Sequence, residues 1–94
     1  MSEDFEKSVD KILEELKRVL IKKHKDYGSA NILESGLVGV LVRTNDKMSR
    51  IKNLSGFGLD WKEKEALNET IEDNWLDLAN YAIINLMLRK NIFK

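Results

Sequence analysis

The stretch EDNWLDLANYAIINLM, from Glu72 to Met87, decides the fold of this chain. Its apolar residues recur every three or four positions, which is the spacing of an amphipathic α-helix. We expect a helix that begins near Asn68, a suitable N-cap residue, and continues to about Lys90. The residues expected to form its core stripe are Ile71, Trp75, Leu78, Ala79, Ala82, Ile83 and Leu86.

The same helix carries two aspartates one turn apart, Asp73 and Asp77, which a core helix does not need. Asn80 and Tyr81 follow directly, and no lysine or arginine occurs in the helix before Arg89. Either these acids form a solvated stripe, or they face a pocket that uses negative charge.

The rest of the chain also favours helices. Proline is absent, and all five glycines lie between Gly28 and Gly58, so helix breakers are confined to the middle of the chain. A first helix is expected from about Glu3 to Lys25 and a second from about Leu37 to Leu54. The segment Leu59–Leu67 is expected to be a short turn of helix or an ordered loop.

The first helix has its own apolar stripe at helical spacing, expected to be buried: Phe5, Val9, Ile12, Leu13, Leu16, Val19 and Leu20. Together these patterns predict an all-α protein, a small bundle of three main helices plus short helical pieces, in which residues 1–94 form a single domain.

Composition narrows the classes of function. Sixteen basic and sixteen acidic residues give a formal net charge of +0, which argues against a nucleic-acid-binding protein. The absence of cysteine excludes disulfides and thiolate chemistry. No signal peptide or membrane span is recognisable, so a cytoplasmic location without membrane association is expected. Because the core of so small a domain is limited, we expect a homodimer.

The acids of the last helix share an arc of about 140°, at 100° per residue. This acidic arc consists of Glu69, Glu72, Asp73 and Asp77, with Asn80 beside them. Carboxylate oxygens are the ligands that Mg²⁺ prefers, and this ion often arrives with a phosphorylated ligand. The alternative is a solvated face.

The second helix presents a mostly basic face made by Arg43, Asp46, Lys47 and Arg50. Two guanidinium groups can hold phosphate oxygens bidentately, with the lysine as an additional point charge. The alternatives are a surface ladder of charges or a salt-bridge partner for the acidic arc.

The segment KHKDYG, residues 23–28, ends the first helix. A glycine after an aromatic residue allows close approach of a ligand to the backbone, and Tyr27 can stack on a base. The alternative is a helix C-cap with a core tyrosine.

Three motifs occur in a fixed order: KxxDYG, then RxxDKxxRIxNL, then EDxxxDLANYAII. This ordered set, from Lys23 to about Met87, resembles the nucleotide modification associated domain family. A more distant resemblance is to the all-α nucleoside triphosphate pyrophosphohydrolases of the MazG type, which hold Mg²⁺ on acids. The chain departs from their EExxE motif, because Glu14 and Glu15 are followed by Arg18 where a third acid is required.

The resemblance implies a protein that binds a nucleotide, and a Mg²⁺-dependent hydrolase of nucleoside phosphates is the enzyme it suggests. The site residues it favours fall into three roles. The catalytic residues would be Glu72, Asp73 and Asp77, and the metal ligands Asp46, Asp73 and Asp77. The nucleotide would be held by Tyr27, Arg43, Lys47, Arg50, Asn80 and Tyr81. The alternative function is a non-catalytic helical module or subunit of a nucleotide-modifying or phage assembly, with the two charged arcs paired to each other.

Overall fold

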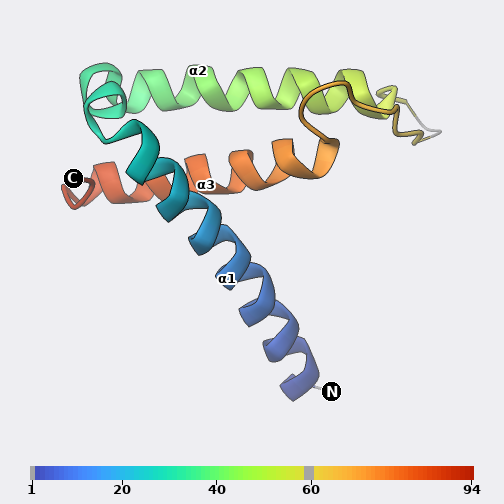
Figure 1. The fold of residues 1–94 in the computed structure, drawn as a ribbon, viewed down its shortest axis with the longest axis horizontal. Helices are drawn as coiled ribbons and strands as arrows, with labels where there is room; N and C mark the ends of the chain where they lie inside the picture. Colours follow the sequence, from blue (N-terminus) through green and yellow to red (C-terminus); the bar gives the residue numbers. More distant parts are fainter. Residues whose placement is uncertain (1, 59–60) are drawn as a thin grey trace.

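The computed structural model describes residues 2–58 and 61–94, with the side chains of residues 2 and 3 excepted. These ranges contain three helices and no strand, so the all-α prediction is confirmed. The helices, shown in Figure 1, are α1 Ser2–Tyr27, α2 Ala30–Ser55 and α3 Ile71–Arg89.

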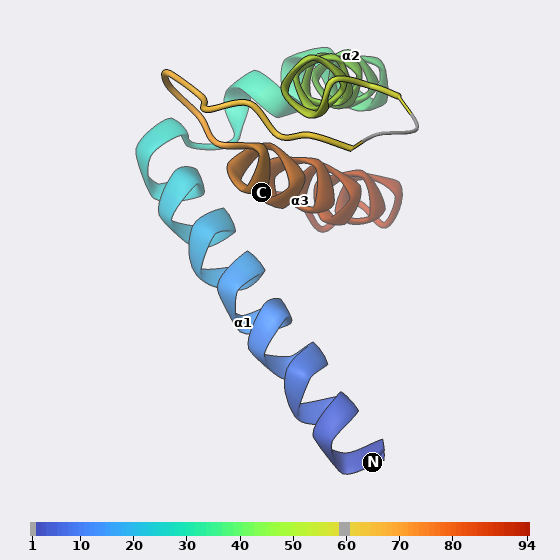
Figure 2. The same ribbon diagram turned by 90° about the vertical axis from the view of Figure 1, so that its right-hand side faces the viewer.

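Helices α2 and α3 lie side by side and run in opposite directions, whereas α1 crosses α3 and then diverges (Figures 1 and 2). Only the C-terminal part of α1 stays close to the other two helices. The N-terminal half projects from the α2–α3 pair as a separate arm. None of the helices in the described part of the chain is apolar over a length that would cross a membrane.

Glycines with left-handed backbone conformation set the two ends of α2. Gly28, with φ of 70°, turns the chain from α1 into α2, and its N–H donates to the carbonyl of His24 at 2.8 Å. Gly56, with φ of 79°, ends α2. Both positions favour glycine because a Cβ atom is strained there.

The second helix begins earlier than Leu37, the start expected from the sequence. It begins at Ala30 and is interrupted by a kink at Gly36, where φ is 60° and ψ is −149°. Gly36, which directly precedes the expected start, therefore lies inside the helix, because the helix resumes after this one non-helical residue.

The start of α3 also differs from the prediction, because the N-cap is Thr70 and not Asn68. The Thr70 hydroxyl oxygen accepts from the Asp73 N–H at 3.0 Å, and the Asp73 carboxylate accepts from the Thr70 N–H at 3.1 Å. This capping box satisfies two backbone donors at once. Residues 61–67 are not helical, and residues 59 and 60 of the expected Leu59–Leu67 segment lie outside the described residues.

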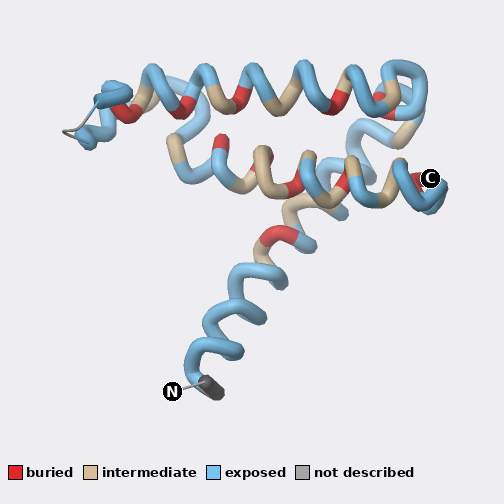
Figure 3. The backbone as a smooth tube through the Cα atoms, turned by 180° about the vertical axis from the view of Figure 1, so that it is seen from behind, coloured by how far each residue is buried: buried red, intermediate tan, exposed pale blue. Residues whose placement is uncertain are grey.

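The buried core is small and lies between α2, the C-terminal part of α3 and the end of the chain. It contains Ile32, Val40, Ile84 and Phe93, with Leu20, Tyr81, Met87 and Leu88 packed against it. Figure 3 shows buried positions along the facing sides of α2 and α3 and almost none in the projecting part of α1.

Neither expected core stripe is buried as a whole, which corrects the sequence-based prediction. On α3, Trp75 and Leu86 are 45% and 56% exposed, and the buried positions are Asn74, Asp77, Asn80 and Ile84. On α1, the stripe is buried only at Leu16, because the helix diverges from its neighbours before that residue. Helical spacing identifies the apolar face of a helix correctly, but it does not say which face the rest of the chain covers.

Candidate functional site

A cavity of about 280 Å³ lies where the three helices meet. Its walls come from the end of α1, from α2, from α3 and from the C-terminal residues of the chain. The polar and aromatic side chains that line it are Lys23, His24, Tyr27, Asn31, Arg43, Lys47, Glu69, Asp77, Asn80, Tyr81 and Phe93.

Asp77 is the buried acid of this cavity. Its carboxylate accepts from the Lys23 ammonium on α1, and its second oxygen lies 2.8 Å from the Lys47 ammonium on α2. The side chains of Lys47 and Asp77 are only 10% and 8% exposed. Asp77 therefore joins all three helices at one point, which explains why an apolar helix keeps this aspartate.

A second acid extends the network toward the mouth of the cavity. Glu69 lies 3.0 Å from the Lys47 ammonium and 3.3 Å from the Arg50 guanidinium. Lys47 thus lies between two carboxylates, and Asp77 lies between two ammonium groups.

The ionisation of the central pair is set by a balance between burial and hydrogen bonding. Burial alone would raise the pKa of Asp77, but hydrogen bonds from Lys23 and Lys47 outweigh it and hold this pKa below its usual value. Burial alone would lower the pKa of Lys47, but hydrogen bonds to Asp77 and Glu69 outweigh it and raise this pKa. Both groups are therefore charged at neutral pH.

The cavity carries an excess of positive charge. Three cations line it, Lys23, Arg43 and Lys47, against the two anions Glu69 and Asp77, which leaves a formal charge of +1. Arg43 is partly buried and has no ion pair or side-chain hydrogen bond within the described ranges 2–58 and 61–94. A partly buried guanidinium without an anion, facing a cavity, is suited to an anionic ligand.

Aromatic and amide groups complete the lining. Tyr27 is 75% exposed at the mouth, whereas Tyr81 is partly buried and Phe93 is buried. The Asn80 amide donates to the carbonyl of Leu16 in α1 at 3.2 Å, while its own Oδ1 has no partner in the described part of the chain. A buried acceptor without a donor is costly, so this oxygen is available to a donor from water or a ligand.

The structure brings six of the predicted site residues to the cavity, namely Tyr27, Arg43, Lys47, Asp77, Asn80 and Tyr81. Four others lie elsewhere. Arg50 lines a neighbouring pocket, Asp73 belongs to the capping box, and Asp46 and Glu72 are exposed outside the cavity.

Five of the polar and aromatic lining residues were not among the predicted site residues: Lys23, His24, Asn31, Glu69 and Phe93. Lys23 could have been found, because it opens the KxxDYG motif. Phe93 lies outside every motif, and it reaches the site only because the chain folds back after α3, where His24 packs edge-on against its ring at 5.9 Å.

The acids predicted to hold Mg²⁺ are dispersed in this structure. Within residues 2–58 and 61–94, no group of three histidine or carboxylate side chains is arranged as a metal site. Asp73 caps α3, Asp46 is exposed on α2, and both oxygens of Asp77 face lysines. The donor set around the cavity thus fits an anion better than a cation held by protein ligands alone.

The sequence pattern of one known family, described as nucleotide modification associated domain 1, matches residues 23–88, more than half of the chain. The chain belongs to this family. The match to the nucleotide modification associated domain begins at Lys23 and ends just before Arg89. It includes every residue that lines the cavity except Leu20 and Phe93, and it excludes the projecting arm. No curated protein and no solved structure matches the chain.

Proposed function

We propose that the cavity binds a nucleotide through its phosphate group. The observation that carries this proposal is Arg43, a partly buried guanidinium that lines the cavity beside the Lys23 and Lys47 ammonium groups and has no ion pair within residues 2–58 and 61–94. Family membership supports a nucleotide as the anion.

The lining groups divide naturally between the parts of a nucleotide. Arg43 and Lys47 contact the phosphate oxygens, and Lys23 adds a third positive charge. Tyr27 at the mouth offers a face on which a base can stack, and the Asn80 Oδ1 accepts from a base or sugar donor. A cavity of about 280 Å³ lies at the lower end of ordinary ligand pockets, so a mononucleotide suits it better than a dinucleotide.

The proposal is tested by isothermal titration with deoxynucleoside mono- and triphosphates and with inorganic phosphate, each with Mg²⁺ and with EDTA. At least one nucleotide should bind, and Arg43→Gln should weaken that binding about tenfold or more, as expected for a lost charged hydrogen bond. Arg18→Gln, an exposed arginine of α1 outside the cavity, is the matched control and should bind as the unaltered chain does. Equal affinity of both variants would overturn the proposal.

Mg²⁺-dependent hydrolysis of the bound nucleotide stays a separate prediction. It is tested by product release with Mg²⁺ and with EDTA, comparing Asp77→Asn with the unaltered chain. If the chain binds the nucleotide but releases no hydrolysis product, the hydrolase prediction is wrong and the binding proposal stands. The cytoplasmic location and the homodimer expected from the sequence also stay predictions.

A second candidate function, a non-catalytic helical module, is favoured by the internal ion pairs of Lys47 with Asp77 and of Arg50 with Glu69. In that case the charges serve stability alone, and Arg43→Gln changes neither ligand binding nor stability. The titration above therefore separates the two functions.

A further inference from the structure

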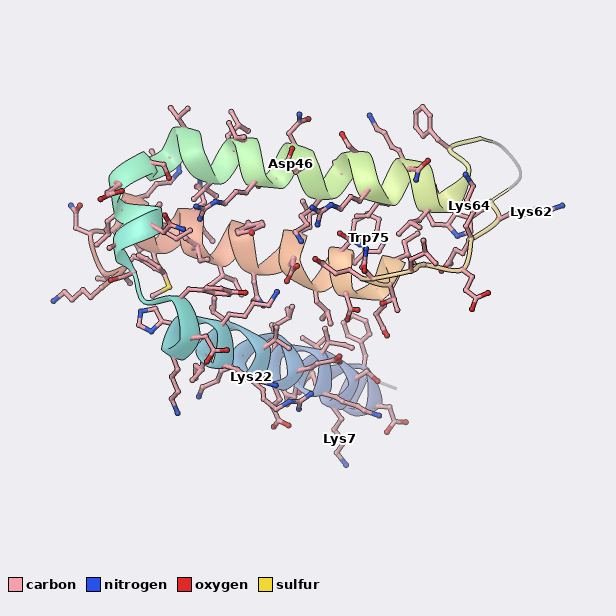
Figure 4. All side chains as sticks on the ribbon, turned by 45° about the horizontal axis from the view of Figure 1, so that its top comes forward. Lys7, Lys22, Asp46, Lys62, Lys64 and Trp75 are labelled. Carbon is pink, nitrogen blue, oxygen red and sulfur yellow. The ribbon has the colours of Figure 1, made fainter. Side chains whose placement is uncertain are left out.

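The projecting half of α1 is an amphipathic helix whose apolar side is left exposed by the rest of residues 2–58 and 61–94. We call residues 4–15 the arm; its apolar side chains are Phe5, Val9, Ile12 and Leu13, which are 39% to 70% exposed. In water a lone helix of this length is marginal, because most helical stability in proteins comes from packing of the apolar face. Figure 4 shows Lys7 extending from α1 on the side away from α2 and α3.

An apolar groove of about 530 Å³ lies between α2 and α3. Its apolar walls are Val40, Leu41 and Met48 from α2, and Leu78, Ala82 and Leu86 from α3. At 100° per residue, Ala82 lies about 160° around the helix from Asn80, the residue that contacts α1. The groove therefore opens on the side of α3 opposite α1, and the chain's own arm does not cover it.

The charges around the two surfaces are opposite in sign. The arm has five acidic and two basic residues, a formal charge of −3. Residues 78–90, which include the α3 wall of the groove, have two basic and no acidic side chains, a formal charge of +2, and Arg89 donates to Asn85 of the groove at 2.8 Å. Such complementarity steers two surfaces together and sets their register.

The available area matches what a stable dimer requires. Four large apolar side chains of the arm are exposed, as are four in or beside the groove: Leu37, Leu41, Trp75 and Leu86. Each half-exposed large side chain offers roughly 100 Å² of surface, about half of what it buries when covered completely. Eight of them amount to about 800 Å² per copy, which is the share of one partner in an interface of standard size.

We propose that the arm of one copy lies in the α2–α3 groove of a second copy, and that the exchange is reciprocal. Such an interface is isologous, since the same two surfaces are used once by each protomer. It covers both apolar stripes that the isolated chain exposes. The proposal does not rest on nucleotide binding, because the arm and the groove contain none of the groups assigned to the nucleotide above; Tyr81 is the one residue that lines both the cavity and the groove within residues 2–58 and 61–94.

The first test is the molar mass in solution, measured by sedimentation equilibrium. The unaltered chain should have about twice the chain mass of 10.9 kDa. Ile12→Asp in the arm and Leu86→Asp in the groove should each yield monomers, whereas Lys11→Asp, on the opposite side of the arm, should remain dimeric. Circular dichroism checks that each variant keeps its helices, and the cross-linking test below uses neither the Ile12→Asp nor the Leu86→Asp substitution. A monomeric unaltered chain, or dimeric Ile12→Asp and Leu86→Asp variants, would overturn the proposal.

The second test identifies which surfaces meet, and it uses the absence of cysteine from the sequence. Val9→Cys and Leu41→Cys are prepared separately, mixed and oxidised. A disulfide between the two different variants is expected to predominate over disulfides within either variant alone. Predominant cross-linking of Val9→Cys with itself would mean that two arms pair with each other, and it would overturn the arm-in-groove arrangement.

Discussion

A helix in a small bundle usually buries its apolar face and exposes its polar face, but α3 does the reverse over much of its length. The inward face carries Asn74, Asp77 and Asn80, all buried, whereas the outward face carries Trp75 and Leu86, both about half exposed. Polar groups inside a fold are costly unless they are paired or used, and apolar groups outside it are favourable only when something covers them. This contrast underlies both proposals made above, a ligand for the inward face and a second chain for the outward face.

The largest effect is expected from breaking the inward face at its central ion pair. Lys47→Met leaves Asp77 with Lys23 alone, and Asp77→Ala leaves Lys47 with Glu69 alone. Removing one partner of a buried pair costs about 3 kcal/mol, and this estimate is the low end of the usual range because each residue keeps one partner. Urea unfolding at a fixed protein concentration measures the loss.

Asp46→Ala, an exposed acid of α2 outside the cavity, is the control and should change the unfolding free energy by less than about 0.5 kcal/mol. If Lys47→Met were as mild as this control, the inward polar face would not hold the helices together.

A smaller loss of stability is expected at the start of α3, where Thr70 caps the helix. Thr70→Ala removes the hydroxyl that accepts from the Asp73 N–H and should cost about 1 kcal/mol. Asn68→Ala should be close to neutral, because Asn68 is not the N-cap. Thermal unfolding of both variants compares them directly, and a larger loss for Asn68→Ala would restore the boundary expected from the sequence.

The smallest effect on the unfolding free energy is expected from a change of pH near neutrality. The pKa of Asp77 is held below 3.8, so its contribution to stability is present above that value and is lost as the pH falls through the folded-state pKa. The pKa of Lys47 is raised above 10.5, so its contribution is present below that value and is lost as the pH rises through the folded-state pKa.

The contribution of this pair to the unfolding free energy should therefore be constant between about pH 5 and 9. Comparing the unaltered chain with the double variant Lys47→Met and Asp77→Leu across this range isolates the contribution. A difference that changes steeply near neutral pH would contradict the charge states assigned to the two groups.

The sequence was sufficient for the number of helices and for six of the eleven polar and aromatic residues that line the cavity. The three motifs contain Lys23, Lys47 and Asp77, and the structure places these residues in contact although α1 and α3 are far apart in the chain. Such long-range pairing cannot be derived from helical spacing, because spacing describes only one helix at a time. The orientation of α3 was not predictable for the same reason.

The sequence does contain a local signal for the start of α3. Thr70 and Asp73 have the spacing of a capping box, and this pattern is more specific than a single asparagine at position 68. The kink at Gly36 has no comparable signal, since an isolated glycine inside a helical pattern is compatible with either a break or a continuous helix.

The turn at Gly28 gives α1 the geometry of a lever. The helix has 26 residues, about 39 Å at 1.5 Å per residue, and Lys23 lies only about 7.5 Å from the turn. A rotation of about 10° around the turn moves the Lys23 backbone by about 1 Å and the far tip of α1 by about 7 Å on the same geometry. The same rotation moves Leu16, about 18 Å from the turn, by about 3 Å, which would break the hydrogen bond from Asn80 to the Leu16 carbonyl, so this one contact with α3 limits the swing of the whole arm.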